Sequence, residues 1–185
     1  MSRITIQEYD DVPEASQTIL DGILKQVGFI PNLFRLMAAS PAVLNGQQSL
    51  QGALAKALDL KTRVKIALAV SQVNDCRYCL AAHSYHAFNQ VKIPADEIAL
   101  NRTGRSSDPK TDAALRFARK VTQDRGHVSD ADLAEVRAAG YSDAQVLEII
   151  AVGAAYLLTN FLNNVADTDV DFPDIDGGRA DATVG

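Results

Sequence analysis

Residues that start helices recur along this chain, and each stands directly before an apolar, Ala-rich run. Ser and Asp cap helices because their side chains accept hydrogen bonds from free backbone N–H groups, and proline is favoured at the next position. Ser40-Pro41 and Asp108-Pro109 show this pattern, and Ser129 and Ser142 are each followed by Asp-Ala. No stretch alternates apolar and polar residues long enough to indicate a sheet. The sequence therefore predicts an all-α protein.

The same start and stop signals predict the order of the helices. After a short extended start we expect helices at 13–28, a short one from Pro31, then 41 to about 58, 62–73, 76 to about 89 with Asp75 as N-cap, a short one from Pro94, 109 to about 126, 129–140 and 143 to about 166. These form one helical domain over residues 1–166, followed by an acidic, flexible tail over 167–185.

Composition and charge narrow the classes of protein further. A chain of 185 residues with 47% hydrophobic residues is long enough for one domain with a substantial core. The net charge of −5 lies entirely in the tail, which holds six aspartates and one base, Arg179. The body is balanced in charge and offers no basic face to nucleic acid.

The chain also lacks the features of a membrane or secreted protein. Its two longest uncharged stretches, 36–55 and 149–166, contain amide side chains that a membrane interior disfavours. The N-terminus has no apolar core of a secretory signal. We therefore expect a cytoplasmic protein with neither nucleic acid nor a membrane as partner.

Cys76 and Cys79 form a C-x-x-C pair, which in a reducing cytosol is more often redox-active or metal-binding than structural. At about 100° per residue on a helix, Cys76, Cys79, His83 and His86 share one stripe. The two cysteines can close a disulfide, and His83 lies one turn beyond Cys79, within reach of its sulfur. The helix dipole favours a thiolate at Cys76, whereas the neighbouring base favours one at Cys79. The spacing leaves open which sulfur attacks a substrate.

Three other interpretations of the cysteine pair compete with redox chemistry. Four zinc ligands on one straight helix would spread over about 15 Å, so a tetrahedral site would need a ligand from elsewhere, such as His127. A thioredoxin-like site expects a strand before the cysteines, and none is predicted. Two buried cysteines can also be inert core residues. We expect no metal and no other cofactor.

The sequence around the cysteine pair, residues 67–83, reads ALAVSQVNDCRYCLAAH. This run resembles the alkylhydroperoxidase-D-like (AhpD-like) branch of the carboxymuconolactone decarboxylase superfamily. The segments that also resemble its peroxidase-related members are 28–35, 40–41, 117–126, 140–143 and 160–164. The resemblance extends over nearly the whole chain up to Phe172-Pro173.

The resemblance implies an all-α fold that assembles into homo-oligomers, commonly trimers or hexamers. It implies reduction of hydroperoxides by the cysteine pair, without haem, flavin or metal. Carried over by position, Cys79 matches the sulfur that attacks the peroxide, Cys76 the resolving cysteine, and His83 the proton-relay base. A dithiol donor, in the best-known members a lipoyl-bearing protein, would reduce the resulting disulfide. A decarboxylase activity is disfavoured, because the lactone-acting branch does not use this pair.

One position departs from the family pattern. The family places a relay glutamate twelve residues before the first cysteine, where this sequence has Val64. Tyr78 stands where some members carry a histidine, and Tyr78 and His86 are the nearest candidates to replace the missing carboxylate. The departure motivates an alternative function, a thiol–disulfide oxidoreductase or redox sensor that does not reduce peroxides. A binding or structural oligomer that has lost its chemistry is a third hypothesis.

Asparagines punctuate the last predicted helix at positions 160, 163 and 164. The rest of this helix is apolar enough to be buried, and buried amides must find hydrogen-bond partners. We expect them to bond across helices or at a subunit interface, and lining of the active site is the alternative.

Overall fold

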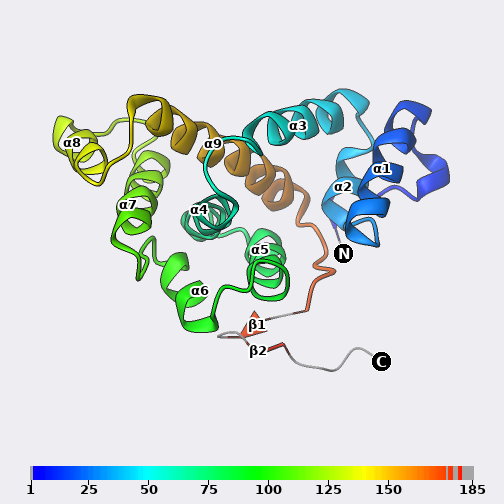
Figure 1. Ribbon diagram of the computed structural model, residues 1–185. Helices are drawn as coiled ribbons and strands as arrows, with labels where there is room; N and C mark the ends of the chain where they lie inside the picture. The colour runs from blue at the N-terminus through cyan, green and yellow to red at the C-terminus, as the bar shows by residue number, and fades with distance from the viewer. Residues whose placement is uncertain (1, 174, 177–178, 181–185) are drawn as a thin grey trace.

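The computed structural model describes residues 2–173, 175–176 and 179–180, and helices dominate this part of the chain (Figure 1). In chain order they are a short 3-10 helix (Tyr9–Asp11), α1 (Glu14–Val27), α2 (Asn32–Met37), α3 (Pro41–Leu54), α4 (Leu60–Val73), α5 (Arg77–Asn89), α6 (Ala95–Arg102), α7 (Pro109–Gln123), α8 (Asp130–Ala138) and α9 (Asp143–Ala166). The prediction of an all-α domain is confirmed.

A two-stranded antiparallel ladder follows the helices. Strand β1 (Ile175–Asp176) pairs with β2 (Arg179–Ala180), with Ile175 opposite Ala180. The sequence analysis predicts no sheet, and this small ladder is the exception. Two residues per strand are too few for alternation to reveal.

Capping side chains start the helices close to where the sequence predicts. Ser40 accepts a hydrogen bond from the Val43 N–H at the start of α3. Capping boxes at Ser129 and Ser142 begin α8 and α9. Two helices end earlier than expected, α3 at Leu54 instead of about 58 and α7 at Gln123 instead of about 126.

Helix α4 lies at the centre of the molecule, with α5, α6, α7 and α9 around it (Figure 1). It is buried on every side, since all residues from Val64 to Ser71 are buried. Residues of α4, α7, α8 and α9 form one apolar cluster. It includes Ile66 of α4, Leu115 of α7 and Ile149 of α9, each with no exposed surface. Helices α1, α2 and α3 form a second apolar cluster around Leu20 and Leu44. This framework fixes α5, which carries the cysteines, against the central helix.

Helix α9 is long and apolar enough by composition to cross a membrane. In this fold it packs against α3, α4, α5 and α7. Its buried amides bond to other helices: Asn160 donates to the hydroxyl of Ser71 on α4 at 3.1 Å, and accepts from Asn74 at 2.9 Å. These contacts place one side of α9 in the core of the protein.

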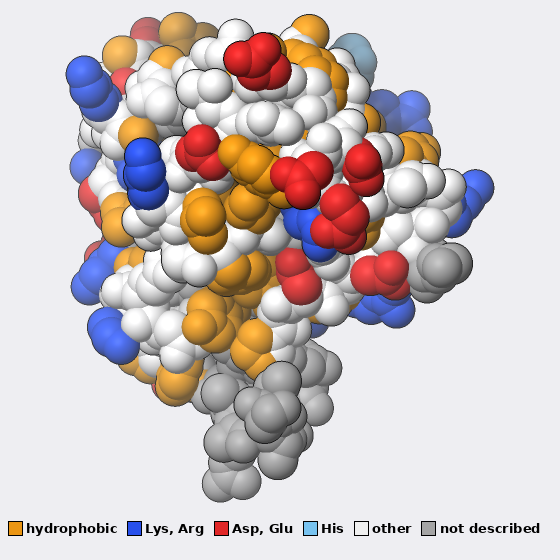
Figure 2. Space-filling view, turned by 90° about the vertical axis from the view of Figure 1, so that its right-hand side faces the viewer, with side chains coloured by type: hydrophobic (Ala, Val, Ile, Leu, Met, Phe, Trp, Pro, Cys, Tyr) orange, Lys and Arg blue, Asp and Glu red, His pale blue; other side chains and the backbone are white. Residues whose placement is uncertain are grey.

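The end of the molecule that carries the N-terminal helices is shown in Figure 2. Acidic side chains gather on this face beside a band of hydrophobic ones, and Lys and Arg lie scattered toward its edges (Figure 2). The exposed acids of this end include Glu8, Asp10, Asp11, Glu14 and Asp21.

The first residues of the predicted tail pack against the body of the protein. Residues 167–173, which we call the C-terminal strap, directly follow α9. The Asp169 carboxylate accepts hydrogen bonds from the backbone N–H and the hydroxyl of Ser2, at 2.9 and 3.1 Å. The Asp171 carboxylate accepts from the backbone N–H of Asn32 at the start of α2, at 2.6 Å. The expected flexibility of the rest of the tail concerns positions that lie largely outside the described residues.

Candidate active site

The turn between α4 and α5 places both cysteines at the N-terminus of α5. Asp75 has a left-handed backbone (φ 49°), which aspartate tolerates better than most residues. Cys76 follows in extended conformation as the N-cap, and its sulfur accepts a hydrogen bond from the Cys79 N–H at 3.2 Å. The predicted cap at Asp75 is therefore wrong by one residue, because the left-handed turn at Asp75 puts the sulfur of Cys76 in the capping position.

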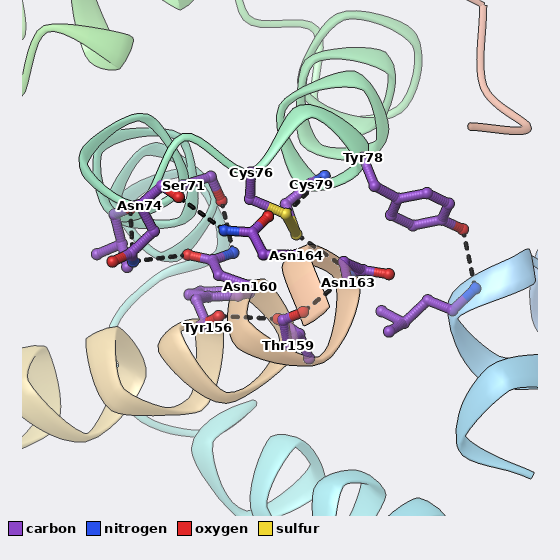
Figure 3. Close-up of a disulfide and its surroundings, with 12 residues drawn as sticks. Ser71, Asn74, Cys76, Tyr78, Cys79, Tyr156, Thr159, Asn160, Asn163 and Asn164 are labelled. Carbon is purple, nitrogen blue, oxygen red and sulfur yellow. Dashed lines mark hydrogen bonds between the residues drawn. A yellow bond between two sulfur atoms is a disulfide. The ribbon is translucent and has the colours of Figure 1, made fainter. Parts of the chain in front are cut away.

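Cys76 and Cys79 form a disulfide, as their spacing allows (Figure 3). Their Cα atoms lie 5.3 Å apart. Both are buried, with 0% and 2% of their surface exposed. They share a small apolar cluster with Tyr78, against which Leu33, Ala82 and Phe172 pack. The pair is thus sheltered, and the disulfide is one of the two states that a redox cycle requires.

The side chain of Asn163 extends from α9 to the sulfur of Cys79 on α5 (Figure 3). Its amide nitrogen donates to Cys79 Sγ at 3.3 Å and to the carbonyl of Thr159 at 3.0 Å. The sequence analysis expects this amide to bond across helices and keeps lining of the active site as an alternative. Its position, between Asn160 and Asn164 on an apolar helix, is the signal for both. Both of those amides bond to α4 or to the residue that ends it.

His83 lies on α5 one turn beyond Cys79. Its ring packs edge-on against Tyr156 of α9, with the ring centroids 5.0 Å apart. Burial, with a smaller contribution from the charge of His86, lowers the pKa of His83 to about 4. None of the described side chains hydrogen-bonds its ring nitrogens. His83 is therefore a neutral imidazole near pH 7 and, with its lowered pKa, a weak base.

Tyr78 and His86, the candidates to replace the relay carboxylate, hold other partners. The Tyr78 hydroxyl accepts a hydrogen bond from the Leu33 N–H of α2 at 3.1 Å, and its ring points away from the disulfide (Figure 3). Burial raises the pKa of Tyr78 far above its usual value. The Nδ1 of His86 lies 2.7 Å from the side-chain oxygen of Gln90, and burial lowers the pKa of His86.

Val64 occupies an apolar environment in place of the family's relay glutamate. It is 3% exposed and belongs to a cluster with Leu68, Ala87, Ile93 and Ile98. The adjacent Lys65 points to a different partner, with its Nζ 2.6 Å from a carboxylate oxygen of Glu97. No carboxylate among the described residues hydrogen-bonds His83. Any proton transfer by His83 would therefore work without a carboxylate partner.

The histidines and acids near the pair do not assemble into a metal-ligand set. Within the described ranges, no three His, Cys, Asp or Glu side chains lie together as metal ligands would. His127, the remaining ligand considered for zinc, follows α7, and α7 contacts α4, α8 and α9.

The C-terminal strap packs against Tyr78, which belongs to the same apolar cluster as the cysteine pair. The ring of Phe172 lies edge-on to Phe29 and Tyr78, with ring centroids 5.6 and 5.8 Å away, and it is tilted against Tyr85 at 5.8 Å. The hydrogen bonds that Asp169 accepts from Ser2 and Asp171 accepts from Asn32 hold the strap in this position. Residues 167–173 therefore form part of the wall of the site.

Comparisons with known proteins support the family that the sequence resembles. Residues 41–124, which include both cysteines and His83, match the model of the carboxymuconolactone decarboxylase family. A solved structure described as an alkylhydroperoxidase AhpD core, an uncharacterized peroxidase-related protein from Ralstonia eutropha JMP134, is similar to this chain. It shares 26% identity with a TM-score of 0.82, and the alignment covers 92% of each chain.

Two further solved structures share the fold. A peroxidase-related protein from Silicibacter sp. TM1040 is 22% identical with a TM-score of 0.75, covering 90% of this chain and 88% of that one. The debrominase Bmp8 is 21% identical with a TM-score of 0.76, covering 91% of each chain. No curated protein sequence matched. Together with the cysteine pair at the start of α5, the family match and the similarity to the Ralstonia structure support this chain as an AhpD-like member of the carboxymuconolactone decarboxylase superfamily.

Proposed function

We propose that this protein is a thiol-dependent hydroperoxide reductase that acts in antioxidant defence. The observation that carries the proposal is the buried Cys76–Cys79 disulfide at a helix N-terminus, with an amide donor on Cys79 and a neutral imidazole one turn beyond it. A reduced pair in this position has both requirements of a peroxidatic cysteine, stabilisation of a thiolate and a partner thiol to resolve the product.

The cycle begins with Cys79 in its reduced form. His83 accepts the thiol proton, and the thiolate attacks the terminal oxygen of the hydroperoxide. The O–O bond breaks, leaving a sulfenic acid on Cys79 and an alkoxide, which takes the proton from His83 and leaves as an alcohol. The Cys76 thiol then condenses with the sulfenic acid, releasing water and forming the disulfide.

The low pKa of His83 determines how this cycle runs without a relay glutamate. An imidazolium with a pKa of about 4 is a strong acid and readily protonates an alkoxide. The same property makes His83 a weak base, so stabilisation of the thiolate falls to the helix N-terminus and the amide of Asn163. We infer a slower peroxidase than one with a complete relay.

A dithiol would complete the cycle by reducing the disulfide and becoming oxidised itself. A lipoyl-bearing protein is one such donor. Because both cysteines are buried and Phe172 packs against their cluster, an extended dithiol arm suits this site better than a bulky protein surface. We propose this reaction in the cytoplasm, within a homo-oligomer.

The alternative is a thiol–disulfide oxidoreductase or redox sensor, and Val64 is the observation that favours it. The apolar cluster at that position supplies no carboxylate to orient His83. Such a protein would exchange disulfides with dithiols and ignore peroxides.

A thiol count separates the two functions. The fully reduced protein is mixed with one equivalent of tert-butyl hydroperoxide, and free thiols and remaining peroxide are followed over seconds to minutes. The proposal expects both thiols to disappear in step with the peroxide. Cys76→Ser should stop at a sulfenic acid that dimedone labels, and Cys79→Ser should be inactive. Survival of both thiols and the peroxide, with rapid reduction of the disulfide by dithiols, would support the alternative instead.

A further inference from the structure

Three asparagines of α9, at positions 160, 163 and 164, lie on one face of the helix, because residues three and four apart are neighbours on a helix surface. Figure 3 shows their side chains extending toward the cysteine pair and the turn before it. Asn163 donates to the sulfur of Cys79. Asn160 and Asn164 bond instead to residues of α4 and its last turn. One face of α9 therefore contacts both Cys79 and the turn that leads to Cys76.

The bonds from α9 hold the end of α4 at three points. The side-chain nitrogen of Asn74, the residue that ends α4, donates to the oxygen of Asn160 at 2.9 Å. The backbone carbonyl of Asn74 accepts from the nitrogen of Asn164 at 2.8 Å. The nitrogen of Asn160 donates to the Ser71 hydroxyl at 3.1 Å. Asn160 and Ser71 have no exposed surface, so water does not compete for this bond.

The same turn determines where Cys76 lies. The Cys76 N–H donates to the backbone carbonyl of Ser71 at 3.0 Å. Asp75, directly before the cysteine, has a left-handed backbone with a φ of 49°. This conformation is unfavourable for residues other than glycine, so surrounding contacts must maintain it. The bonds from α9 to Ser71 and Asn74 supply such contacts on the residues that precede Asp75.

We propose that Asn160 and Asn164 are positioning residues, which keep the sulfur of Cys76 close to Cys79 when the disulfide is reduced. In the disulfide form the S–S bond itself holds the two sulfurs together. In the dithiol form the turn and its contacts limit the motion of Cys76, so the bonds from α9 raise the effective concentration of one thiol at the other.

Two consequences follow from a high effective concentration. Formation of the disulfide is favoured against any external thiol, which is a property of the pair alone. The Cys76 thiol also attacks a sulfenic acid on Cys79 faster, releasing water and forming the disulfide. The second consequence rests on the proposed function, whereas the first does not involve peroxide.

Equilibrium with glutathione measures the effective concentration directly. The protein dithiol reduces one oxidised glutathione to two glutathione thiols and becomes the disulfide, and alkylation after acid quenching gives the ratio of the two protein forms. Asn164→Ala removes the donor to the Asn74 carbonyl at an exposed position. The dithiol form relaxes when this bond is lost and the disulfide form cannot, so the equilibrium constant for disulfide formation should fall about three- to tenfold. Asn74→Ala, which breaks the bond to Asn160, should lower it similarly.

Matched variants separate positioning from a general loss of stability. Asn164→Gln keeps the amide donor on a longer side chain and should recover part of the lost equilibrium constant. Asn89→Ala removes an amide that donates to the Tyr85 carbonyl within α5, and it should leave the constant unchanged. Thermal unfolding of each variant is measured in both redox forms. Equal destabilisation of the two forms, with an unchanged constant in Asn164→Ala and Asn74→Ala, would show a purely structural role and overturn the proposal.

Peroxide distinguishes this inference from the proposed function. After one equivalent of tert-butyl hydroperoxide, dimedone should label more sulfenic acid in Asn164→Ala than in the wild type, because resolution by Cys76 is slower. A protein whose glutathione equilibrium responds to Asn164→Ala, but which ignores peroxide, would overturn the reductase and uphold the positioning role. A protein that consumes peroxide, with the wild-type equilibrium constant in both Asn164→Ala and Asn74→Ala, would overturn the positioning role and uphold the reductase.

Discussion

At the scale of single residues, we expect the hydrogen bond from Asn163 to Cys79 to stabilise the thiolate of the pair. The amide nitrogen lies 3.3 Å from the sulfur and is fixed by its second bond to Thr159. A hydrogen bond to an ionised group contributes about 1.5–3 kcal/mol. Asn163→Ala in the reduced protein should therefore shift the pH midpoint of the thiolate absorbance at 240 nm upward by about one to two units.

Two further variants make this prediction specific. Asn163→Asp keeps the shape but places a negative charge beside the sulfur, so the midpoint should rise at least as far. Asn89→Ala, which removes an amide that bonds within α5, should leave the midpoint unchanged. Folding of each variant is verified by circular dichroism. An unshifted midpoint in Asn163→Ala would show that the helix N-terminus alone stabilises the thiolate.

His83 connects the site to the pH dependence of folding. An unfolded imidazole binds a proton below about pH 6.5, whereas folded His83 stays neutral down to about pH 4 because it is buried. The unfolded state thus holds more protons between these values, and the free energy of unfolding falls as the pH drops through that window. His83→Gln should remove about 1–3 kcal/mol of this acid-induced loss.

Urea denaturation at pH 7 and pH 4.5 measures the effect of His83. The loss of stability between the two pH values should be smaller in His83→Gln than in the wild type. His127→Gln exchanges an exposed histidine and should keep the wild-type loss. Equal losses in the wild type and His83→Gln would mean that His83 already binds its proton above pH 4.5.

At the scale of elements, we expect the strap to limit access to the cysteine pair. Phe172 packs against the cluster of Cys76, Tyr78 and Cys79 and against three aromatic rings. Phe172→Ala would open this wall, so dithiothreitol should reduce the disulfide about three- to tenfold faster, as expected if burial limits access. Phe88→Ala, which removes a partly buried ring of α5 that packs near Val64, is the matched control. Equal rates in all three proteins would contradict a gating strap.

The elements also show which parts of this structure the sequence could predict. The caps at Ser40, Ser129 and Ser142 were predictable because a cap depends on residues three positions away. The cap at Cys76 was missed because it depends on the left-handed turn at Asp75, which a residue pattern does not reveal.

The cysteine pair and His83 were assigned from local spacing and from the family resemblance. Asn163 lies 84 positions from Cys79, and Phe172 reaches the site from the far end of the chain. Such contacts depend on how α5, α9 and the strap pack together, and periodicity within a single helix carries no information about them. The substitution at Val64 was visible in the sequence, but its apolar surroundings were not.

For the whole molecule, one face of α9 is where we expect copies of the chain to meet. Exposed apolar side chains follow this helix at a helical spacing, at Leu147, Ile150, Leu158, Phe161 and Val165. Leu147, Phe161 and Val165 are 67%, 55% and 62% exposed. The buried side of the same helix carries Asn160 and Asn163. Apolar stripes of this length on a soluble protein mark interaction surfaces, so we predict that this face forms the interface of a homo-oligomer.

Introducing charge tests that interface directly. The double variant Leu147→Glu, Phe161→Glu places two carboxylates on the stripe, where burial would cost several kcal/mol, so it should be monomeric when the wild type is a trimer or hexamer. Light scattering coupled to size-exclusion chromatography measures the mass. Leu100→Glu alters an exposed leucine on α6 and should keep the wild-type mass. If the double variant assembles like the wild type, another surface must hold the subunits together. A wild type that is already monomeric would contradict the oligomer itself and leave the α9 stripe as ordinary exposed surface.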